Sequence, residues 1–237
     1  MDDIFNYEHP FVCTDAVVLT ISTSEPDSYR KLPATGLNVL LYRRTTEPYQ
    51  GKWCLPGGFL DVDETPEDNI CRKIAEKSHI DQCWLEQLYT FCDPCRDPRA
   101  RVLSIAYLGL MNEAESKRFD SESTWFNVLY NADGTISFQN GGLLIAEQDL
   151  GFDHYAIIRK AIERLRSKIL YSDIIFHLLP EEFSLTQLQN AFEAIRGKKE
   201  QSANFRRKVL DMVRETGRRT SDKGHRPAQL YRQKEMD

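Results

Sequence analysis

A glycine-rich loop that runs directly into an amphipathic helix, residues 57–80, constrains the fold of this chain more than any other feature. Thr65 is placed to cap the helix, Pro66 stands at its first position, and Asp68 follows three residues after the cap. At 100° per residue the helix divides into an apolar and a polar arc. The arc expected to be buried holds Ile70, Cys71, Ile74, Ala75 and Ser78, and the opposite arc holds Arg72, Lys73, Glu76 and Lys77. We expect the polar arc to face whatever the glycine loop encloses.

The same stretch resembles the Nudix box, whose pattern is G-x5-E-x7-R-E-U-x-E-E-x-G-U, where U is a bulky aliphatic residue. The positions that match in register are Gly58, Glu64, Arg72, Ile74, Glu76 and Ile80, and residues 55–59 resemble the family's usual entry into the loop. Lys73 and Lys77 stand where the family has glutamates, and His79 stands where it has glycine. The resemblance implies an α/β fold, the Nudix α/β/α sandwich.

The two lysines bear on catalysis. In Nudix hydrolases the glutamates at these positions hold the magnesium ions that polarise a diphosphate and position a water. Magnesium requires hard oxygen ligands, whereas the ammonium groups of Lys73 and Lys77 repel it. We therefore expect no catalytic residues, no metal ligands and no cofactor, with magnesium entering only if the chain is a hydrolase after all. In that alternative Glu64 and Glu76 would hold the metal together with acids outside the box, such as Asp61, Asp63 and Glu67.

Charge is distributed unevenly along the 237 residues, which suffice for one large domain or a domain with a small module. The net charge is -5, but residues 184–237 hold 13 Lys and Arg against 7 Asp and Glu, a net charge of +6. Residues 1–183 hold 18 basic and 29 acidic residues, a net charge of -11. An acidic body with a basic end is expected when only one end meets a polyanion.

Targeting signals are not evident. No apolar run approaches the ~20 residues of a membrane helix, and the first residues lack the basic and apolar regions of a signal peptide. We expect a cytoplasmic protein with no membrane partner.

Among the six cysteines, Cys92 and Cys95 have the spacing of a zinc or redox pair, but no second pair accompanies them, so free thiols are favoured, several of them buried.

Strand and helix patterns surround the box. Apolar and β-branched residues predict strands over residues 12–22, 37–44, 84–91, 102–111 and 125–129, a polar loop over 23–36 and a long helix over 153–168. Between two of these strands, residues 95–107 carry Arg96, Arg99 and Arg101. Arginine forks bind phosphates in a bidentate manner, which favours a pocket for a diphosphate or sugar phosphate, although a hairpin with solvated arginines is the alternative.

This segment is also similar to the Arg-Asp-Pro-Arg-Gly-Arg-Val-Val-Ser region of Nudix proteins tied to ADP-ribose, which tilts the interpretation toward a pocket. The candidate effector-binding residues come from the box, the arginine segment and the end of the second strand. They are Arg43, Arg44, Gly58, Phe59, Arg72, Lys73, Glu76, Lys77, Arg96, Arg99 and Arg101.

The C-terminal residues have the order of a winged helix-turn-helix. Residues 183–197 predict a helix in which Ser184 and Gln187 form a capping box and Gly197 is the stop. A second, basic helix starts at Ser202 with Phe205, Val209, Met212 and Val213 facing inward and Arg214 outside, and a basic hairpin follows over residues 216–232. The alternative is a small helical appendage solubilised by its charges. The candidate DNA-binding residues are Ser202, Asn204, Arg206, Arg207, Lys208, Arg218, Arg219, Lys223, His225 and Arg226.

Residues 183–232 resemble the winged-helix end of the Nudix-related transcriptional regulators of NAD metabolism, which divides the chain into domains 1–178 and 179–237. The resemblance implies a homodimeric repressor of NAD biosynthesis or salvage genes that binds operator DNA and is released by ADP-ribose. Lys73 and Lys77 fit that role, because a sensor must hold its ligand without cleaving it. Two alternatives stay open, a Nudix hydrolase of ADP-ribose or a related nucleoside diphosphate, and a repressor of the same architecture that responds to a sugar, as in arabinose use.

Overall fold

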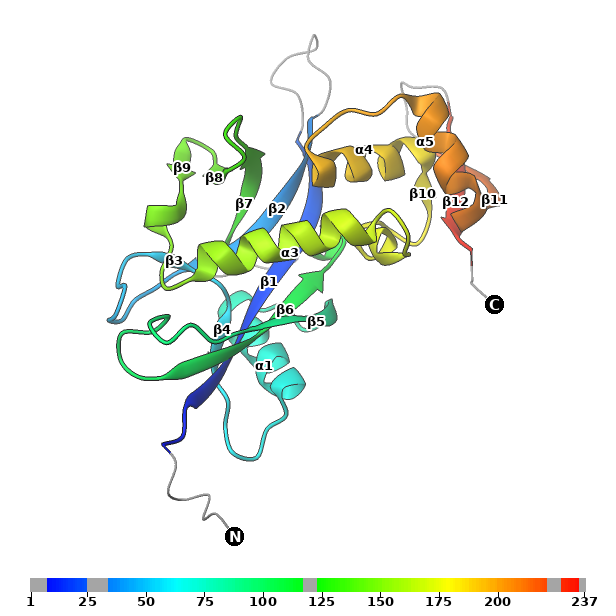
Figure 1. Ribbon diagram of the computed structural model, residues 1–237. Coiled ribbons are helices and arrows are strands. Elements are labelled where there is room, and N and C mark those ends of the chain that lie inside the picture. Colours follow the sequence, from blue (N-terminus) through cyan, green and yellow to red (C-terminus); the bar gives the residue numbers. More distant parts are fainter. Residues whose placement is uncertain (1–7, 25–33, 117–122, 221–226, 235–237) are drawn as a thin grey trace.

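The strands and helices form two connected parts in the computed structural model, which describes residues 8–24, 34–116, 123–220 and 227–234 (Figure 1). In the first part the strands are β1 Phe11–Ser24, β2 Ala34–Arg43, β3 Trp53–Cys54, β4 Gly57–Phe59, β5 Trp84–Phe91, β6 Val102–Leu110, β7 Ser123–Tyr130, β8 Ile136–Asn140 and β9 Leu143–Ile145, and the helices are α1 Pro66–Ser78, α2 Glu113–Ser116 and α3 His154–Lys168. The second part holds β10 Phe183–Ser184, α4 Leu185–Arg196, α5 Ser202–Val209, β11 Val213–Arg219 and β12 Gln229–Gln233.

The first part is built on a mixed sheet with the strand order β5-β6-β1-β2-β7-β8-β9, to which β3 adds beside β2 and β4 beside β1. β1 pairs with β6 in parallel, with Phe11 opposite Val102, whereas β1 pairs with β2 and β4 in antiparallel fashion. β1 therefore lies at the centre, and the glycine loop is fixed to it through the pairing of Asp15 with Gly57.

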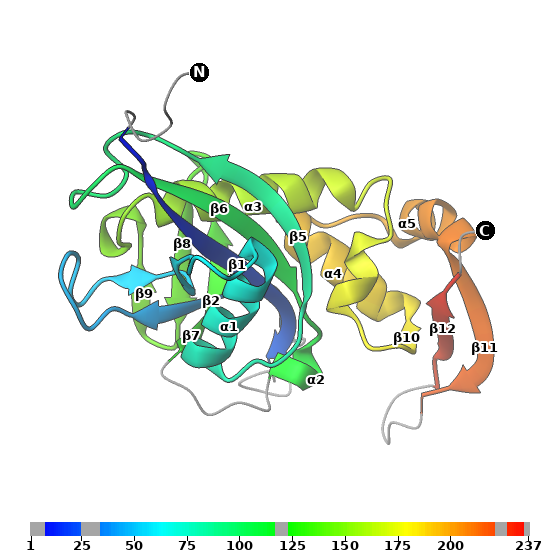
Figure 2. The ribbon, with the colours of Figure 1, turned by 90° about the horizontal axis from the view of Figure 1, so that it is seen from below.

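Helices cover both faces of this sheet, with α1 on one side and α3 on the other (Figure 2). Val17 and Leu19 of β1 belong to the core beneath α3, whereas Ala16 and Val18 belong to the core beneath α1. Successive residues of a strand point to opposite faces, so a strand covered on both sides reads as a nearly continuous apolar run. The predicted α/β/α sandwich is confirmed.

The box helix begins as its sequence predicts. The backbone N–H of Asp68 donates to Oγ1 of Thr65 at 3.1 Å. His79 ends the helix in the left-handed region with φ 55°, at the position where the Nudix pattern has glycine. The expectation that Cys71 is buried was wrong. The buried arc follows the four-residue spacing of Ile70, Ile74 and Ser78, and Cys71 lies exposed beyond its edge.

In the second part, the strand order is β10-β12-β11. Ser184 and Gln187 form the predicted capping box of α4, and Gly197 ends that helix at φ 69°. The second helix is shorter than predicted, because α5 ends at Val209, and Val213 and Arg214 belong to β11. In that strand Val213 pairs with Gln233 of β12 and is buried. Because Val213 and Arg214 pair with β12 as strand residues, they do not extend α5. Lys223, His225 and Arg226 lie outside the described residues.

A single apolar core passes from the first part into the second. It runs from the sheet and α3 through a short 3₁₀ helix, Ile174–Leu178, into α4 and α5. Phe176 stacks on Phe183 with ring centroids 5.5 Å apart, across the proposed boundary between residues 178 and 179, which stays a prediction.

The polar loop is shorter than predicted, since β1 extends to Ser24 and β2 begins at Ala34, and residues 25–33 lie outside the described part.

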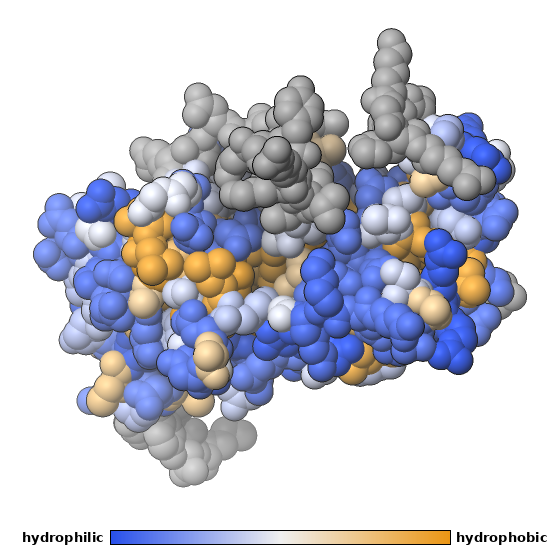
Figure 3. Space-filling view, turned by 90° about the horizontal axis from the view of Figure 1, so that it is seen from above, coloured by the Kyte–Doolittle hydropathy of each residue, from blue (hydrophilic) through white to orange (hydrophobic). Residues whose placement is uncertain are grey.

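The surface is mostly hydrophilic, with apolar patches between the polar side chains on the face that Figure 3 shows. Leu143 and Leu144 are exposed on β9, the last strand of the sheet order. The predicted homodimer stays a prediction. Within the part of the chain that the structure describes, no helix has both the length and the apolar character to cross a membrane.

Candidate functional site

A cavity of about 200 Å³ opens where β1, β4, the segment after β5 and the start of α3 meet. It is lined by Cys13, Asp15, Tyr42, Arg44, Leu55, Gly57, Gly58, Phe59, Arg96, Asp97, Arg99, Phe152 and His154. The lining combines guanidinium groups, carboxylates and aromatic rings. Such a cavity suits a ligand that has both an anionic group and a flat ring.

Arg96 joins two elements at the floor of this cavity. Its guanidinium donates to Asp153 through Nε at 3.0 Å and Nη2 at 2.7 Å, and to Asp15 at 3.2 Å. The side chain of Arg96 is only 3% exposed, so its buried positive charge is stabilised by these two carboxylates instead of by water. Burial alone would raise the pKa of Asp15, but His154 and Arg96 beside it, with the Ser104 hydroxyl that donates to it at 2.6 Å, hold this pKa below its usual value.

His154, the first residue of α3, is held from two sides. The backbone N–H of Leu55 donates to its Nδ1 at 3.0 Å, so Nδ1 carries no proton. Its Nε2 faces Oδ1 of Asp15 at 3.5 Å and carries the proton toward that carboxylate. The imidazole thus ties β1, the residue after β3 and α3 together behind the cavity.

Arginines and aromatic rings form the mouth of the cavity. The guanidinium of Arg99 lies 5.4 Å from the ring centroid of Phe59 and 5.7 Å from that of Phe152. Arg44 lies over the same Phe152 ring at 5.2 Å. Asp97 orients Arg99 by accepting from its Nε at 3.0 Å and its Nη2 at 2.7 Å. The side chain of Arg99 is 43% exposed, so it can reach an incoming anion.

The structure brings together part of the predicted effector-binding set. Arg44, Gly58, Phe59, Arg96 and Arg99 line the cavity. Arg43 does not, because neighbours along an extended chain point to opposite sides, and its Nε donates to the carbonyl of Gly51. Arg101 is turned away and donates to the carbonyl of Cys92 at 2.7 Å. The remaining members of the set, Arg72, Lys73, Glu76 and Lys77, lie on α1 outside the cavity lining.

Sequence reasoning missed several lining residues. Asp15 and Cys13 lie on β1, and Phe152 and His154 lie at the start of α3. Asp15 carries a detectable signal, since a carboxylate inside an apolar strand needs a buried partner. His154 and Phe152 carry no such signal, because only the packing of α3 across the sheet brings residues so distant in sequence to the same cavity.

The polar arc of α1 forms a network beside the glycine loop. Arg72 donates to Glu64 through Nε at 2.5 Å, to Glu76 at 2.8 Å and to Asp61 at 3.0 Å. The hydrogen bonds from Arg72 and Asn69 lower the pKa of Glu64 to about 2. Lys73 pairs with Glu76 at 3.1 Å. Arg72 therefore engages both carboxylates of the box, Glu64 and Glu76.

The basic surface of the second part lies on α5 and β11. Arg206, Arg207 and Lys208 are exposed on α5. On β11, Arg218 and Arg219 are also exposed. Phe205 and Val209 anchor the opposite face of α5 in the core, and Phe205 packs on Phe192 of α4 with ring centroids 5.4 Å apart. This burial fixes which face of α5 is presented outward.

Residues 175–233 match the family model described as the NrtR DNA-binding winged helix domain, and residues 32–130 match the NUDIX domain. The chain is also 31% identical over 234 residues to the ADPR responsive transcriptional repressor NtrR of Acinetobacter baylyi, a match that covers 96% of this chain and 83% of that protein. The chain belongs to the NrtR family.

Two further relatives place this NrtR-family chain. The crystal structure of Shewanella oneidensis NrtR complexed with a 27mer DNA is similar with a TM-score of 0.70 and 33% identity, covering 94% of this chain and 93% of that one. The ADP-ribose pyrophosphatase of Methanocaldococcus jannaschii is 31% identical over 102 residues, which are 43% of this chain and 52% of that protein. The first likeness spans both parts of the chain.

The residues of this NrtR-family Nudix box do not fit a magnesium site. Lys73 and Lys77 bring ammonium groups to the arc where cleaving relatives have carboxylates, and Lys77 lies over the Tyr42 ring at 5.0 Å. Glu64 and Glu76 are already engaged by Arg72. Across the described residues, no group of three or more His, Cys, Asp and Glu side chains has a geometry that would hold a metal ion.

Proposed function

We propose that this protein is a DNA-binding transcriptional repressor whose Nudix part binds ADP-ribose or a related nucleotide sugar and whose winged helix binds an operator. One observation carries the proposal. The cavity gathers Arg44, Arg96 and Arg99 beside the rings of Phe59 and Phe152, in a chain that ends in an exposed basic helix. The named response of the Acinetobacter baylyi relative to ADPR supports the same effector class.

The effector chemistry follows from the cavity. A diphosphate is a polyanion whose oxygens match the parallel N–H groups of a guanidinium. Arg99 and Arg44 lie at the mouth with exposed or partly exposed ends, while Phe59 and Phe152 offer flat faces for a base or a ribose. A nucleotide sugar provides both groups, whereas an unphosphorylated sugar leaves the arginines without an anion.

Binding without cleavage is the second element of the proposal. Lys73 supplies positive charge beside the glycine loop in place of a divalent cation, and Lys77 adds a second ammonium group on the same helix. The chain would then hold a diphosphate without the metal-bound water that cleaves it. We therefore propose a sensor without enzymatic activity or cofactor.

DNA binding would use the exposed face of α5. In winged helix proteins the second helix of the motif enters the major groove, and a dimer places two such helices on two half-sites. Arg206, Arg207 and Lys208 are exposed on that face. The proposed repressor acts as a homodimer in the cytoplasm, and control of NAD biosynthesis or salvage genes stays a prediction. To change an operator from nearly full to nearly empty, the effector must bind the conformation that releases DNA about 5 kcal/mol more tightly than the conformation that binds DNA.

A selection experiment tests this function. Genomic fragments bound by the purified full chain are recovered and sequenced, with and without ADP-ribose, and the enriched duplex is titrated by fluorescence anisotropy. We expect a specific duplex whose affinity falls when ADP-ribose is added. Failure to enrich any duplex at modest salt would overturn the DNA-binding assignment, and an enriched duplex that ignores ADP-ribose but responds to a sugar such as arabinose would establish the sugar-responsive alternative.

A second candidate function is hydrolysis of ADP-ribose, favoured by the similarity of 102 residues of this chain to the Methanocaldococcus jannaschii pyrophosphatase. Its test is release of AMP from ADP-ribose with magnesium or manganese. We expect no release at the enzymatic rates of about 1 per second or more. Turnover in that range would replace the sensor with an enzyme.

A further inference from the structure

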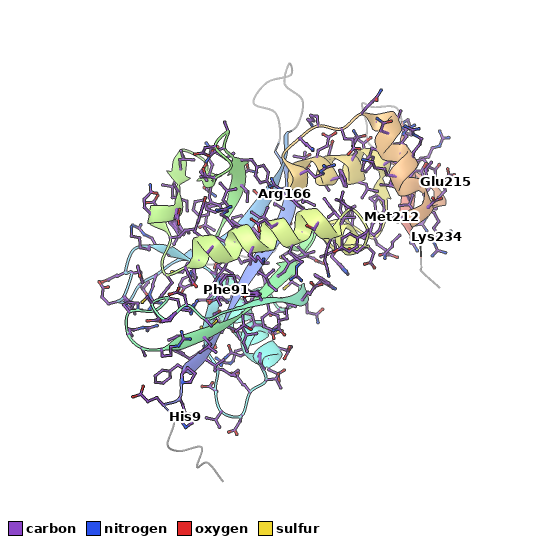
Figure 4. All side chains as sticks on the ribbon, viewed as in Figure 1. His9, Phe91, Arg166, Met212, Glu215 and Lys234 are labelled. Carbon is purple, nitrogen blue, oxygen red and sulfur yellow. The ribbon has the colours of Figure 1, made fainter. Side chains whose placement is uncertain are left out.

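Helix α3 begins at the cavity and extends to the winged helix. Its first residue, His154, lines the cavity together with Phe152, and Arg166 lies twelve residues beyond His154. At 1.5 Å per residue, His154 and Arg166 are about 18 Å apart along the axis. Figure 4 shows Arg166 on the side of α3 that faces α4.

At its far end, α3 helps to cap α4. The backbone carbonyl of Ile195 accepts from Nε of Arg166 at 2.9 Å and from the hydroxyl of Tyr130 at 3.0 Å. Nη2 of Arg166 donates to the carbonyl of Arg196 at 3.4 Å, and its guanidinium lies 4.1 Å from the centroid of the Tyr130 ring. The last carbonyls of a helix lack partners within the helix, and a cation is favourable there. We call Arg166, Tyr130 and the carbonyl of Ile195 the clamp.

The clamp leaves little freedom between the two parts. A Cβ added to Gly197, the residue that ends α4, would overlap the Tyr130 ring. The end of α4 therefore lies directly against a residue of β7, and its carbonyls are satisfied by side chains of the Nudix part. A movement of α3 cannot leave the position of α4 unchanged while the clamp is intact.

At its near end, α3 depends on charges that an anionic ligand would disturb. Asp153, the residue before the helix, accepts a hydrogen bond from Arg96. Arg96 also donates to Asp15 and contacts Sγ of Cys13 at 3.6 Å. Asp153 accepts from Nε and Nη2 of Arg96, so a phosphate that binds either of these groups competes with Asp153. Occupancy of the cavity is thus coupled to the contact that fixes the start of α3.

The middle of α3 is suited to transmit such a change. Ile157, Ile158, Ala161, Ile162 and Leu165 are at most 2% exposed. A packed interior does not deform continuously, so a helix buried along one face shifts as a unit or stays in place. The two ends of α3 therefore move together.

We propose that α3 is the coupling element that carries effector occupancy from the Asp153–Arg96 contact to the winged helix through the clamp. This inference rests on the proposed function, because it presumes an effector in the cavity and DNA on α5. An effector alters DNA affinity only when it binds the two positions of α3 unequally. Removing the clamp separates the two sites and leaves each site able to bind its own ligand.

Arg166→Met and Tyr130→Phe test the clamp, because each removes donors to Ile195 while preserving most of the side-chain volume. Arg159→Met on the exposed face of α3 is the matched control, since its described ion-pair partner is Glu163 of the same helix. For each full-length protein the affinity for ADP-ribose is measured by calorimetry. The affinity for the selected duplex is measured with and without saturating ADP-ribose. The coupling factor is the ratio of the duplex affinity without ADP-ribose to the duplex affinity with it.

We expect the coupling factor of the parent protein to lie in the range of about 5 to 150 that allosteric sites show, and to fall toward one in Arg166→Met and Tyr130→Phe. The affinity for ADP-ribose should stay within about threefold of the parent value, and the Arg159→Met factor should be unchanged. A folded Tyr130→Phe and Arg166→Met that both retain the parent factor would overturn the clamp. Should the parent itself show a factor of one, the proposed function would fail first.

Hydrogen exchange gives a readout that does not depend on DNA. In the parent protein, ADP-ribose should change the exchange rates of the amides around the end of α4, residues 195–200, far from the cavity. In Arg166→Met this change should vanish while the change around residues 152–154 persists. An unchanged response at residues 195–200 in the variant would show that the signal takes another route.

Discussion

Lys73 lies directly against Gly58: a Cβ built on Gly58 would be 2.6 Å from Cε of Lys73 and 3.4 Å from its Nζ. The ammonium group is thereby held beside the glycine loop, and Glu76 accepts from it at 3.1 Å. In a cleaving relative of the Nudix type, a carboxylate at this position would draw a cation to the same place. Here the positive charge belongs to the chain itself, as the proposed sensor without a metal requires.

Reversing the two lysine charges should create a metal site. Lys73→Glu with Lys77→Glu places carboxylates on the arc that already holds Glu76, and clustered carboxylate oxygens are the ligands that magnesium and manganese prefer. Calorimetric titration with either ion should reveal binding that the parent lacks. The matched control is Lys73→Gln with Lys77→Gln, which removes the ammonium groups but adds no charge and should bind neither ion. A folded Glu double variant with no affinity for divalent ions would show that the register of the box is misassigned.

The two glycines of the loop should respond differently to alanine. A Cβ on Gly57 would overlap the backbone carbonyl oxygen of Thr14 and Oδ1 of Asp15, whereas a Cβ on Gly58 meets the movable end of Lys73. Gly57→Ala should therefore lower the free energy of unfolding by about 1–3 kcal/mol, and Gly58→Ala by less than about 1 kcal/mol. Urea denaturation of both variants measures the difference. Equal losses of unfolding free energy would mean that β1 moves away from a Cβ at position 57 as easily as Lys73 moves away from one at position 58.

Acid should destabilise the box through Glu64. Its pKa is lowered from 4.5 to about 2 by the hydrogen bonds from Arg72 and Asn69. A carboxyl whose pKa is lowered on folding contributes stability above the unfolded pKa and loses it as the pH falls through the folded one, so the loss falls between pH 4.5 and about 2. Glu64→Gln should reduce the proton uptake on unfolding in that window by up to about one proton. Unfolding free energies measured at several pH values check this, with Glu163→Gln on the exposed face of α3 as the control.

Neighbouring arginines at the end of β2 provide a test of the cavity. Arg44 lines it and lies over Phe152, whereas Arg43 points away and donates to the carbonyl of Gly51. Arg44→Met should weaken ADP-ribose binding by about 1.5–3 kcal/mol, the usual contribution of a hydrogen bond to a charged group, while Arg43→Met should leave it nearly unchanged. Calorimetry with ADP-ribose measures both. A loss confined to Arg43→Met would place the effector on the other side of the sheet.

The local elements could be predicted from the sequence because their signals are local. The capping residues Thr65 and Ser184 mark helix starts through bonds to residues three positions on, and the structure places both as predicted. The cavity was only half predicted. The Arg96 and Arg99 segment was visible as a dense arginine run, whereas the role of Phe152 depends on how α3 crosses the sheet. Long-range packing of this kind leaves no pattern in neighbouring residues, and it also decided that Val213 pairs in a strand instead of extending α5.

The exposed basic residues of α5 should carry DNA affinity without contributing to effector binding. Arg206 is exposed beside the buried Phe205, so truncating it removes a charge from the surface of α5 and leaves the core intact. If Arg206 contacts a phosphate, Arg206→Ala should weaken binding to all duplexes alike and reduce the slope of log K against log salt by about 0.9. If it reads a base, the loss should be about 1–3 kcal/mol and confined to the selected duplex. Anisotropy titrations at several salt concentrations distinguish the two, with Arg159→Ala of α3 as the charge-matched control. Loss of ADP-ribose binding in Arg206→Ala with DNA affinity intact would contradict the assignment of α5 to DNA, since the cavity and α5 lie in different parts of the chain.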